Sequence, residues 1–282
     1  MQVLFDIAKK EGLQLKTFLK LLGGNINLVF LLETYSEKLV IKLNQKQAFP
    51  NMFTQEALAL QKLAKTKSFT IPKIIANGEY ENYSYLVLQH IPSGVETDKF
   101  WFSFAKNLAQ LHKNSNRQFG WESKNYIGSL PQFNKYCSTS ADFYISQRLQ
   151  PQFNLAIQNG FKFPKLTSFY DKVQKLIPTA EIPALIHGDL WSGNYMVDHN
   201  QNPVLIDPAI CYGSREMDLA MMQLFGGFPA DVFKVYDKHY PLLEDWTNRI
   251  ELYQLYYLLV HLNIFGESYL NSVLRIMHKY SS

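Results

Sequence analysis

The chain has 282 residues, of which 47% are hydrophobic and 15% aromatic, a composition that can bury a large core and differs from that of a disordered chain. Its formal net charge of +4 is too small to make nucleic acid or an acidic membrane the expected partner. The cysteines are Cys137 and Cys211, without a Cys/His cluster, which excludes structural zinc and a disulfide framework and favours a reducing compartment. The sequence shows neither a signal peptide nor an apolar run of membrane-spanning length, so we expect a soluble, cytoplasmic protein.

Residues 1–91 have the pattern of a small lobe built from strands and a helix. Apolar residues recur at helical spacing from Leu4 to Leu22, which predicts one or two short helices ending at a glycine pair. Further along, the periodicity predicts a β-hairpin of residues 26–34 and 38–43, followed by a helix at residues 54–65. It then predicts a short strand at residues 71–75, a turn at Gly78 and another strand at residues 83–89.

Residues 92–282 have the pattern of a larger lobe in which helices dominate. Helices are predicted at residues 104–111, 143–156 and 169–176, and amphipathic helices from residue 232 onward. The exceptions are two short apolar strands, 185–186 and 203–206, each of which leads into a loop that carries a carboxylate. This order predicts an α+β protein with two domains, residues 1–91 and 92–282.

The strongest motif is H-x-D-x-x-x-x-N, formed by His187, Asp189 and Asn194, followed by Asp207 at the end of the second strand. Phosphoryl transfer needs one carboxylate to accept the proton of the acceptor hydroxyl, and oxygen ligands that hold Mg²⁺ on the nucleotide phosphates. We therefore expect Asp189 to be the catalytic base and Asn194 and Asp207 to be the metal ligands. His187 is expected to orient the loop through hydrogen bonds rather than to act in catalysis.

The N-terminal part supplies groups that suit a nucleotide. Lys42 ends the strand Leu-Val-Ile-Lys, and Glu56 on the following helix is placed to pair with its ammonium group. Backbone N–H groups of Gly23, Gly24 and Asn25, just before the first hairpin strand, could approach phosphates without obstruction, although a helix-terminating glycine pair explains them nearly as well.

The strand that runs into Gln89, His90 and Ile91 could offer its backbone groups to the edge of an adenine ring before the chain enters residues 92–94. Competing signatures are absent from the sequence: it has no Walker A motif, no G-x-S-x-G, no H-E-x-x-H and no G-x-G-x-x-G.

Five segments together resemble one family: HGDLWSGN, DPAICYGSREMDLAMMQLFGGFP, GGNIN, FGWESKNYIG and RLQPQF. They are similar to the fructosamine kinase (ketosamine 3-kinase) family, within the protein-kinase-like superfamily that includes the aminoglycoside phosphotransferases. The resemblance covers almost the whole chain. It implies a bilobal protein-kinase-like fold, with a small N-terminal lobe of antiparallel sheet and helix and a larger, mainly helical C-terminal lobe.

The resemblance also implies an activity: ATP-dependent phosphorylation of the 3-hydroxyl group of a ketosamine, a reaction of the deglycation-repair type, with ATP and Mg²⁺ as cofactors and a glycated amine or protein as partner. The family positions match Asp189 as the proton acceptor, Lys42 with Glu56 as the ion pair, Gln89 to Ile91 as the adenine-binding hinge, and Asn194 with Asp207 as the Mg²⁺ site. Asp218 matches a family position that supports the catalytic loop, and a carboxylate favoured by the dipole at a helix N-terminus explains it equally well. Trp191 and Arg215 are further candidates for substrate contact or support: the indole of Trp191 could pack on a sugar face, and an aromatic core position is the alternative. We expect a monomer.

Two other functions stay open from the sequence. The first is an aminoglycoside or other small-molecule phosphotransferase of the same superfamily, although the C-terminal segment has no marked acidic excess that a polycationic drug would favour. The second is a silent kinase-like binding module, although such a homologue would usually lack at least one of the groups that are present here.

Overall fold

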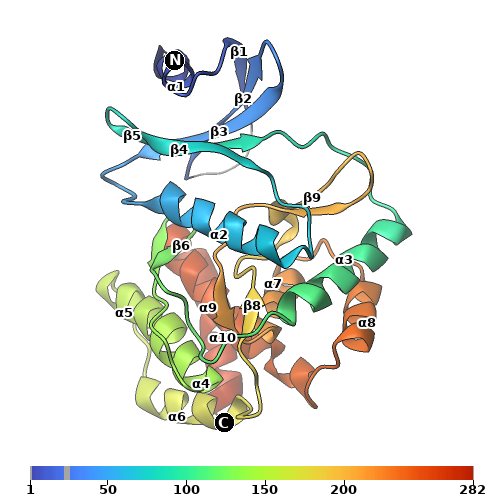
Figure 1. The fold of residues 1–282 in the computed structure, drawn as a ribbon. Coiled ribbons are helices and arrows are strands. Elements are labelled where there is room, and N and C mark those ends of the chain that lie inside the picture. The colour runs from blue at the N-terminus through green and yellow to red at the C-terminus, as the bar shows by residue number, and fades with distance from the viewer. Residues whose placement is uncertain (1, 22–25, 282) are drawn as a thin grey trace. The chain divides into compact units, whose positions relative to one another are not determined.

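A five-stranded antiparallel sheet organises the N-terminal part of the chain, in the order β1-β2-β3-β5-β4 (Figure 1). The structure is a computed structural model that describes residues 2–21 and 26–281. Its strands, in chain order, are β1 (Leu15–Lys20), β2 (Leu28–Thr34), β3 (Lys38–Gln45), β4 (Ile74–Tyr80) and β5 (Tyr83–Gln89). The predicted hairpin is confirmed, because β2 and β3 pair from Leu28↔Leu43 to Glu33↔Lys38.

Each face of this sheet carries one helix, as Figure 1 shows. The helix α1 (Gln2–Lys10) packs Leu4 and Ile7 against Leu39 and Ile41 of β3, while α2 (Met52–Thr66) covers the other face. Since successive side chains of a strand point to opposite faces, β3 directs Leu39, Ile41 and Leu43 toward α1 and Lys42 toward α2. The helix predicted at residues 54–65 is confirmed as α2.

Of the one or two helices predicted before Gly23, one is present as α1, but the helical pattern at residues 15–20 is wrong, because these residues form the edge strand β1. The pairing of β1 with β2 has an irregularity between Leu15 and Thr17, so Leu15 and Phe18 both pack against the same core. This bulge gives the strand a burial period of three residues, which imitates the spacing of a helix.

The turn predicted at Gly78 is also wrong, since Gly78 lies inside β4 and pairs with Tyr85 of β5. A Cβ atom at Gly78 would lie 2.8 Å from the Tyr85 hydroxyl oxygen, so the glycine makes room for a neighbouring ring instead of bending the chain. The reversal between β4 and β5 falls at residues 81–82, where Glu81 has a φ of 51°.

The described residues pack into two compact units. The first is formed by residues up to Val95 together with Met196–Ile206, and the second by Glu96–Tyr195 and Asp207–Ser282. The sequence placed the division after residue 91. In the structure the first unit runs slightly further and takes in a later segment, because Gly94 N donates to Val197 O, Thr70 N donates to Pro203 O, and Leu205 N donates to Thr70 O.

The second unit is mainly helical. Its helical elements are α3 (Asp98–His112), α4 (Ser140–Phe143), the π-helix η1 (Tyr144–Leu149), α5 (Gln150–Gln158), α6 (Leu166–Leu176), the 3₁₀ turn η2 (Ser192–Asn194), α7 (Glu216–Leu224), α8 (Ala230–His239), α9 (Trp246–Phe265), the 3₁₀ turn η3 (Glu267–Tyr269) and α10 (Leu270–Ser281). The single helical stretch predicted at residues 143–156 thus includes α4, η1 and α5. Thr97 begins α3 by accepting a hydrogen bond from Phe100 N.

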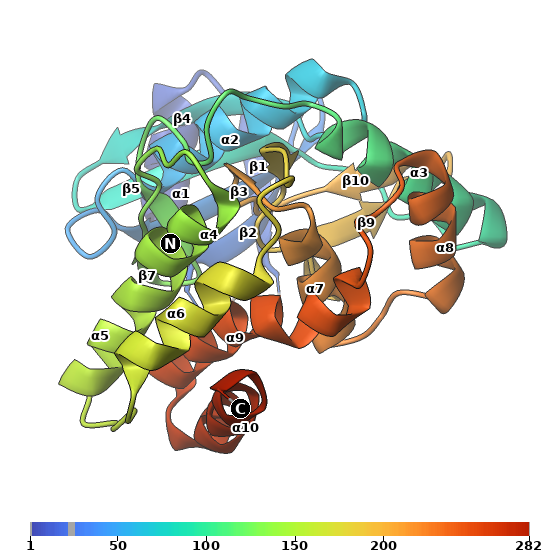
Figure 2. The same cartoon turned by 90° about the horizontal axis from the view of Figure 1, so that it is seen from below.

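The helix α9 differs from the predicted amphipathic pattern, because its buried residues lie all around it. α5, α7 and α10 all pack on α9, and Figure 2 shows them around it. A helix enclosed on every side is apolar on every side, so the prediction holds for α8 and α10 but not for α9.

Short strand pairs complete the fold: β6 (Asn125–Ile127) with β7 (Leu130–Gln132), β8 (Ala184–Ile186) with β11 (Cys211–Gly213), and β9 (Tyr195–Val197) with β10 (Pro203–Leu205). The strands predicted at residues 185–186 and 203–206 are therefore confirmed as β8 and β10.

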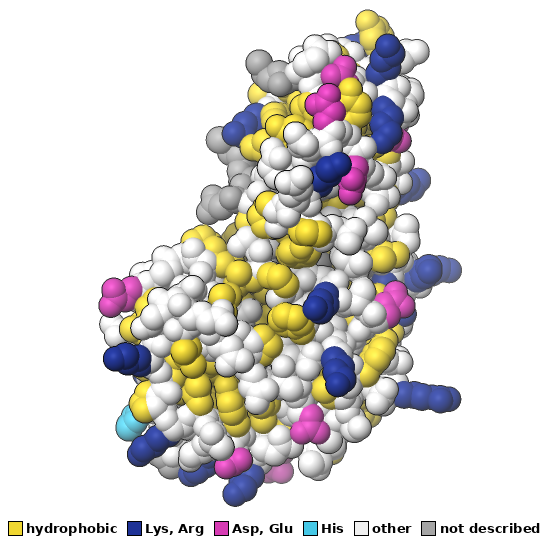
Figure 3. Space-filling model, turned by 90° about the vertical axis from the view of Figure 1, so that its left-hand side faces the viewer, with side chains coloured by type: hydrophobic (Ala, Val, Ile, Leu, Met, Phe, Trp, Pro, Cys, Tyr) yellow, Lys and Arg dark blue, Asp and Glu magenta, His cyan; other side chains and the backbone are white. Residues whose placement is uncertain are grey.

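The surface has no single concentration of positive charge where Figure 3 shows it: on the described part of that face, Lys and Arg side chains are spread out, some of them beside Asp or Glu. Within residues 2–21 and 26–281, we find no helix with the length and apolar character that crossing a membrane requires.

Candidate active site

The loop after β8 carries the proposed base. Gly188 has a φ of 83°, and a Cβ atom there would lie 2.1 Å from Ala209 O, so only glycine fits this close approach of two backbone segments. Asp189 follows, and its N–H donates to His187 Nδ1 at 3.3 Å. His187 is fully buried, which agrees with the orienting function expected from the sequence.

Asp189 and Asn194 are bound to each other. Asn194 Nδ2 donates to the backbone oxygen of Asp189 at 2.8 Å and to its side-chain Oδ2 at 3.0 Å. The short turn η2 makes this possible, because it returns the chain by one turn and Asn194 N donates to Trp191 O. Within the described part of the chain, Asp189 Oδ1 and Asn194 Oδ1 accept no hydrogen bond, so both are available to a ligand.

Asp207 lies close to Asp189 although β9 and β10 separate them along the chain. Burial, and then the negative charge of Asp207, raise the pKa of Asp189 to about 7, against the opposing hydrogen bond from Asn194. Asp207 has a φ of 54°, a left-handed conformation that non-glycine residues seldom adopt. The two carboxylates of the motif are therefore neighbours, as the strand pattern predicted.

Asp218, in the first turn of α7, holds the backbone of this loop. Its Oδ2 accepts from His187 N at 2.7 Å and its Oδ1 from Gly188 N at 2.8 Å, and the side chain is fully buried. His112 Nε2 lies 3.1 Å from Oδ2, and His112 Nδ1 lies 2.8 Å from the Tyr236 hydroxyl. Burial lowers the pKa of His112, so the neutral ring donates to Asp218 and accepts from Tyr236.

Lys42 and Glu56 form a buried ion pair in the first unit. Lys42 Nζ lies 2.6 Å from Glu56 Oε1, and the two side chains are 7% and 11% exposed. The alternation of β3 and the α2 face next to Phe53 and Ala57 bring them together. Removing one partner would leave an uncompensated buried charge, which costs about 3–5 kcal/mol.

The predicted hinge residues follow directly from β5. Gln89 N donates to Lys73 O at 2.8 Å, so this group is used within the first unit. His90 and Ile91 lie beyond the last β-pair, and the structure describes no hydrogen bond to their backbone groups. Burial, with the nearby charge of Lys38, lowers the pKa of His90. The expected phosphate-covering residues Gly23, Gly24 and Asn25 lie outside the described residues.

Trp191 and Arg215 differ in what surrounds them. Trp191 is 39% exposed, and its ring covers Gly193, where a Cβ atom would lie 2.4 Å from the indole. Arg215 is buried, donates to Tyr240 O at 2.7 Å and to Pro241 O, and lies 3.8 Å from the centre of the Tyr240 ring. Arg215 therefore ties α7 to the end of α8, whereas Trp191 presents an aromatic surface beside the base.

Two residues that support the loop were missed from the sequence. His112 ends α3 and, as a lone histidine on an apolar face, gave no motif signal. Tyr257, in the middle of α9, donates from its hydroxyl to Gly188 O at 3.1 Å. Only packing of distant helices against residues 187–188 reveals either role.

The donor set fits a magnesium ion in part. Mg²⁺ in nucleotide sites usually takes one or two carboxylates and completes its shell with phosphate oxygens and water. Asp207 lies near Asp189, and Asn194 is hydrogen-bonded to Asp189, so these side chains could contribute carboxylate and amide oxygens to such a set. Among the described residues there is no group of three or more His, Cys, Asp or Glu side chains that could hold a metal ion.

Comparison with known proteins places the chain in a family. Residues 2–282 match the model of the fructosamine kinase family. A probable ketoamine kinase of Synechocystis is 40% identical over 249 residues, covering 88% of this chain and 84% of the relative. The crystal structure of a putative fructosamine-3-kinase from Haemophilus somnus matches with a TM-score of 0.88 at 27% identity, covering 97% of this chain and 95% of that one.

A more distant match, at 14% identity and a TM-score of 0.69, is an aminoglycoside phosphotransferase in a complex with ADP and hygromycin B, covering 99% of this chain and 97% of that one. At this identity the likeness concerns the fold, and it confirms the predicted protein-kinase-like α+β architecture. The full-length match to the family model and the identity to the ketoamine kinase together show that the chain belongs to the fructosamine kinase family.

Proposed function

We propose that this protein transfers the γ-phosphoryl group of ATP to the 3-hydroxyl group of a ketosamine, the sugar part of a glycated amine or protein. The observation that carries the proposal is that Asp189, after β8, is hydrogen-bonded to Asn194 of η2 and lies near Asp207, after β10, in a chain that matches the fructosamine kinase family over residues 2–282.

Asp189 is the proposed base. Its Oδ2 is occupied by Asn194 Nδ2, so Oδ1 is the atom that faces the acceptor. In the transfer, the acceptor hydroxyl loses its proton to this oxygen while the hydroxyl oxygen bonds to the γ-phosphorus and the bond to the β,γ-bridging oxygen breaks. Catalysis of this reaction is mostly positioning, and Asp218 and Tyr257 supply it by fixing the backbone of residues 187–188.

Asn194 and Asp207 are the proposed ligands of Mg²⁺. When bound, this ion neutralises phosphate charge that would otherwise repel the attacking oxygen. In the first unit, the Lys42 ammonium is the proposed phosphate contact and Glu56 orients it. Backbone groups of His90 and Ile91 are the proposed adenine contacts, and Gly23, Gly24 and Asn25 are proposed to cover the phosphates.

An aromatic surface next to the base supports a sugar as acceptor. Residues 225–228 touch the base-bearing loop, since a Cβ atom at Gly227 would lie 2.6 Å from Ser192 Cβ. Phe225 is exposed and lies against His261, with ring centres 4.8 Å apart and the ring planes tilted by 46°, and Trp191 is exposed on the same loop as Ser192. Aromatic faces pack well on the C–H faces of sugars and on the apolar stem of a lysine adduct.

The first test replaces the base. Asp189→Asn keeps the shape of the side chain but removes its capacity to take a proton, so we expect kcat with fructosyl-lysine to fall by about 10²–10⁴-fold. Binding of ATP, measured by calorimetry, should stay within a few-fold of wild type. Asp231→Asn, which changes an exposed carboxylate of α8, is the matched control. Turnover of Asp189→Asn close to that of the control would reject the assignment of the base.

The second test concerns the acceptor. ADP release is measured with fructosyl-lysine, ribulosyl-lysine and kanamycin, and phosphorus NMR of the product locates the phosphate. We expect both ketosamines to be phosphorylated at the 3-hydroxyl group. Kanamycin-dependent release exceeding that of the ketosamines would favour the aminoglycoside alternative instead.

A further inference from the structure

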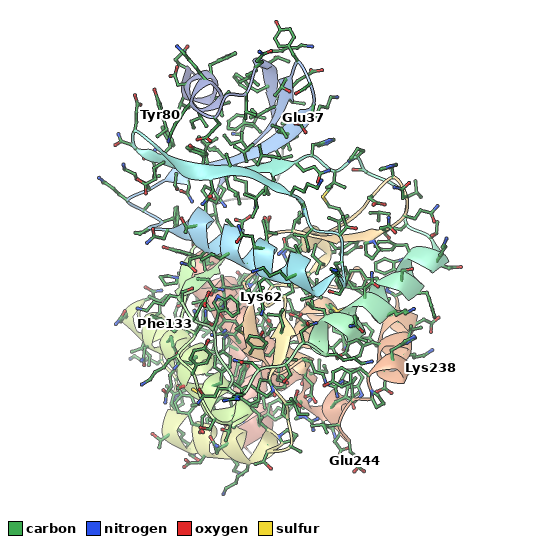
Figure 4. All side chains as sticks on the ribbon, in the orientation of Figure 1. Glu37, Lys62, Tyr80, Phe133, Lys238 and Glu244 are labelled. Atoms are coloured by element: carbon green, nitrogen blue, oxygen red, sulfur yellow. The ribbon has the colours of Figure 1, made fainter. Side chains whose placement is uncertain are left out.

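Arg148 is a cation buried in the second unit without a carboxylate partner. It lies in the π-helix η1, is 1% exposed, and forms no ion pair with any residue that the structure describes. Its guanidinium donates to Phe133 O and, at 2.8 Å, to Asn134 Oδ1, and it lies against the rings of Phe143 and Tyr256 at 4.5 and 5.5 Å. Figure 4 labels Phe133, in the segment that follows β7. A buried charge is costly, and π-helical segments are frequent at functional sites, so the position invites an explanation.

A chain of buried amide side chains leads away from Arg148. Asn134 Nδ2 donates to Asn125 Oδ1 at 2.9 Å, and Asn125 Nδ2 donates to Ile210 O at 2.9 Å. Gln132 Nε2 donates to the same Asn125 Oδ1 at 2.9 Å and to Ala209 O at 3.0 Å. All three amides are 5% exposed or less.

The direction of these hydrogen bonds is fixed from both ends. Arg148 can only donate, so the oxygen of Asn134 must face it and the amide nitrogen must face Asn125. At the other end, the backbone oxygens of Ala209 and Ile210 can only accept. Tyr256 connects Gln132 with Arg148, because its hydroxyl donates to Gln132 Oε1 at 2.7 Å and its ring lies against the Arg148 guanidinium. We call Arg148, Asn134, Asn125, Gln132 and Tyr256 the amide network.

The end of the network is the segment that carries Asp207. Ala209 and Ile210 follow Asp207 after one intervening residue, Pro208, and Asp207 itself has the strained φ of 54°. Ala209 N donates to His187 O at 2.9 Å, and Ala209 O presses against Gly188. Gln132 and Asn125 thus fix the backbone oxygens of residues 209 and 210 by hydrogen bonds. These bonds therefore restrict the backbone that carries Asp207 relative to the loop of Asp189.

We propose that the amide network positions Asp207 for the metal ion, and that Arg148, Asn134, Asn125 and Gln132 are positioning residues of this enzyme. The inference rests on the proposed function in one respect, the assignment of Asp207 as a metal ligand. It predicts that damage to the network weakens divalent-metal binding and lowers kcat, while the KM for the ketosamine stays nearly constant. A network that only stabilised the fold would lower the melting temperature and leave metal affinity unchanged.

The test compares two buried glutamines. Gln132→Met keeps the size of the side chain but removes its hydrogen bonds to Ala209 O, Asn125 and Tyr256. Gln152→Met is the matched control, because Gln152 is 4% exposed and bonds to Asn263 through its side chain, away from residues 207–210. The probe is Mn²⁺, titrated by electron paramagnetic resonance in the presence of a non-hydrolysable ATP analogue, so that binding is measured without turnover.

We expect Gln132→Met to raise the Kd for Mn²⁺ by about 10–100-fold, as is usual when residues that orient metal ligands are lost, and Gln152→Met to change it less than twofold. Should Gln132→Met fail to fold, Arg148→Lys serves in its place. It keeps the buried charge but loses the fork that reaches both Phe133 O and Asn134, and the same weakening of Mn²⁺ binding is expected. Wild-type Mn²⁺ affinity in a folded network variant overturns the proposal.

Asp207→Asn separates this inference from the proposed function. If Asp207→Asn weakens Mn²⁺ binding but the network variants do not, the positioning role is wrong and the metal assignment stands. If Asp207→Asn binds Mn²⁺ like wild type, the metal assignment itself fails. If the wild type binds Mn²⁺ with nucleotide and does not phosphorylate ketosamines, the proposed acceptor is wrong while the network result remains interpretable.

Discussion

Asp218 lies in the first turn of α7, where a carboxylate commonly binds N–H groups of its own helix, and the sequence left that function and support of the loop equally open. In the structure its oxygens accept from the backbone of His187 and Gly188 and from His112. The resemblance therefore identified Asp218, but its hydrogen-bond partners became known only from the structure. The sequence carries no signal that distinguishes a carboxylate bound to N–H groups of its own helix from one bound to N–H groups of a distant loop.

Glu181 predicts a pH dependence of stability. Burial, and then the charge of Glu216, raise the pKa of Glu181 from 4.5 to about 7. The unfolded chain releases this proton near pH 4.5 and the folded chain near pH 7, so the contribution of Glu181 to stability is present below pH 4.5 and is lost as the pH rises to 7. The full loss is about 3 kcal/mol.

Glu181→Gln cannot ionise and should remove this loss. We expect the urea unfolding free energy of wild type, relative to the variant, to decrease by up to about 3 kcal/mol between pH 4.5 and pH 8. Glu244→Gln, at an exposed glutamate labelled in Figure 4, is the control and should show no such change. If the difference in unfolding free energy between wild type and Glu181→Gln is the same at both pH values, the raised pKa of Glu181 is contradicted.

At the scale of elements, β1 shows where periodicity misleads. Its bulge between Leu15 and Thr17 places Leu15 and Phe18 on one face, and a spacing of three residues is also that of a helix. Pairing with β2 decides between the two, and pairing is a long-range property. The hairpin of β2 and β3 and the helix α2 were predicted correctly, because their alternating and helical patterns are regular.

Gly78 gives a prediction at the same scale. A Cβ atom there would lie 2.8 Å from the hydroxyl oxygen of Tyr85, a fully buried side chain that donates to Glu11 next to α1. Gly78→Ala must displace the ring and disturb the contact between β5 and α1. We expect a loss of about 1–3 kcal/mol in unfolding free energy, measured by urea denaturation.

The control for this prediction is a double-mutant cycle. Tyr85→Phe removes the nearest atom, so Gly78→Ala should cost less in the Tyr85→Phe background than in wild type. An equal cost in both backgrounds would show that the Tyr85 hydroxyl is not the obstacle.

At the scale of the whole molecule, the chain leaves the second unit after Tyr195, adds residues 196–206 to the first unit, and returns at Asp207. The candidate metal ligands Asn194 and Asp207 flank this excursion along the chain. The segment is held by backbone bonds, one of which joins Gly94 N to Val197 O at 2.8 Å. The attachment of residues 196–206 within the first unit thus depends on main-chain contacts that need close approach.

Gly94→Ala should disrupt the attachment of residues 196–206 to the rest of the first unit. Its Cβ atom would lie 2.0 Å from Asp198 O, a backbone atom that cannot rotate away as a side chain could. We expect a loss of about 1–3 kcal/mol in stability and faster amide hydrogen exchange in residues 196–206. Ser93→Ala, at the exposed neighbouring position, is the control. Unchanged exchange in residues 196–206 would argue against the main-chain contact as the anchor.

The sequence by itself determined the class of the protein, the order of most elements and the residues of the motif: Asp189, Asn194 and Asp207, with Lys42 and Glu56. Polar residues at fixed spacings next to apolar strands are local features, so they can be recognised from a single sequence. The tertiary structure alone showed that His112, Tyr257 and the amide network around Arg148 hold those loops. These contacts join residues far apart in the chain, and a hydrogen bond between distant side chains leaves no periodic pattern, because it depends on packing rather than on spacing.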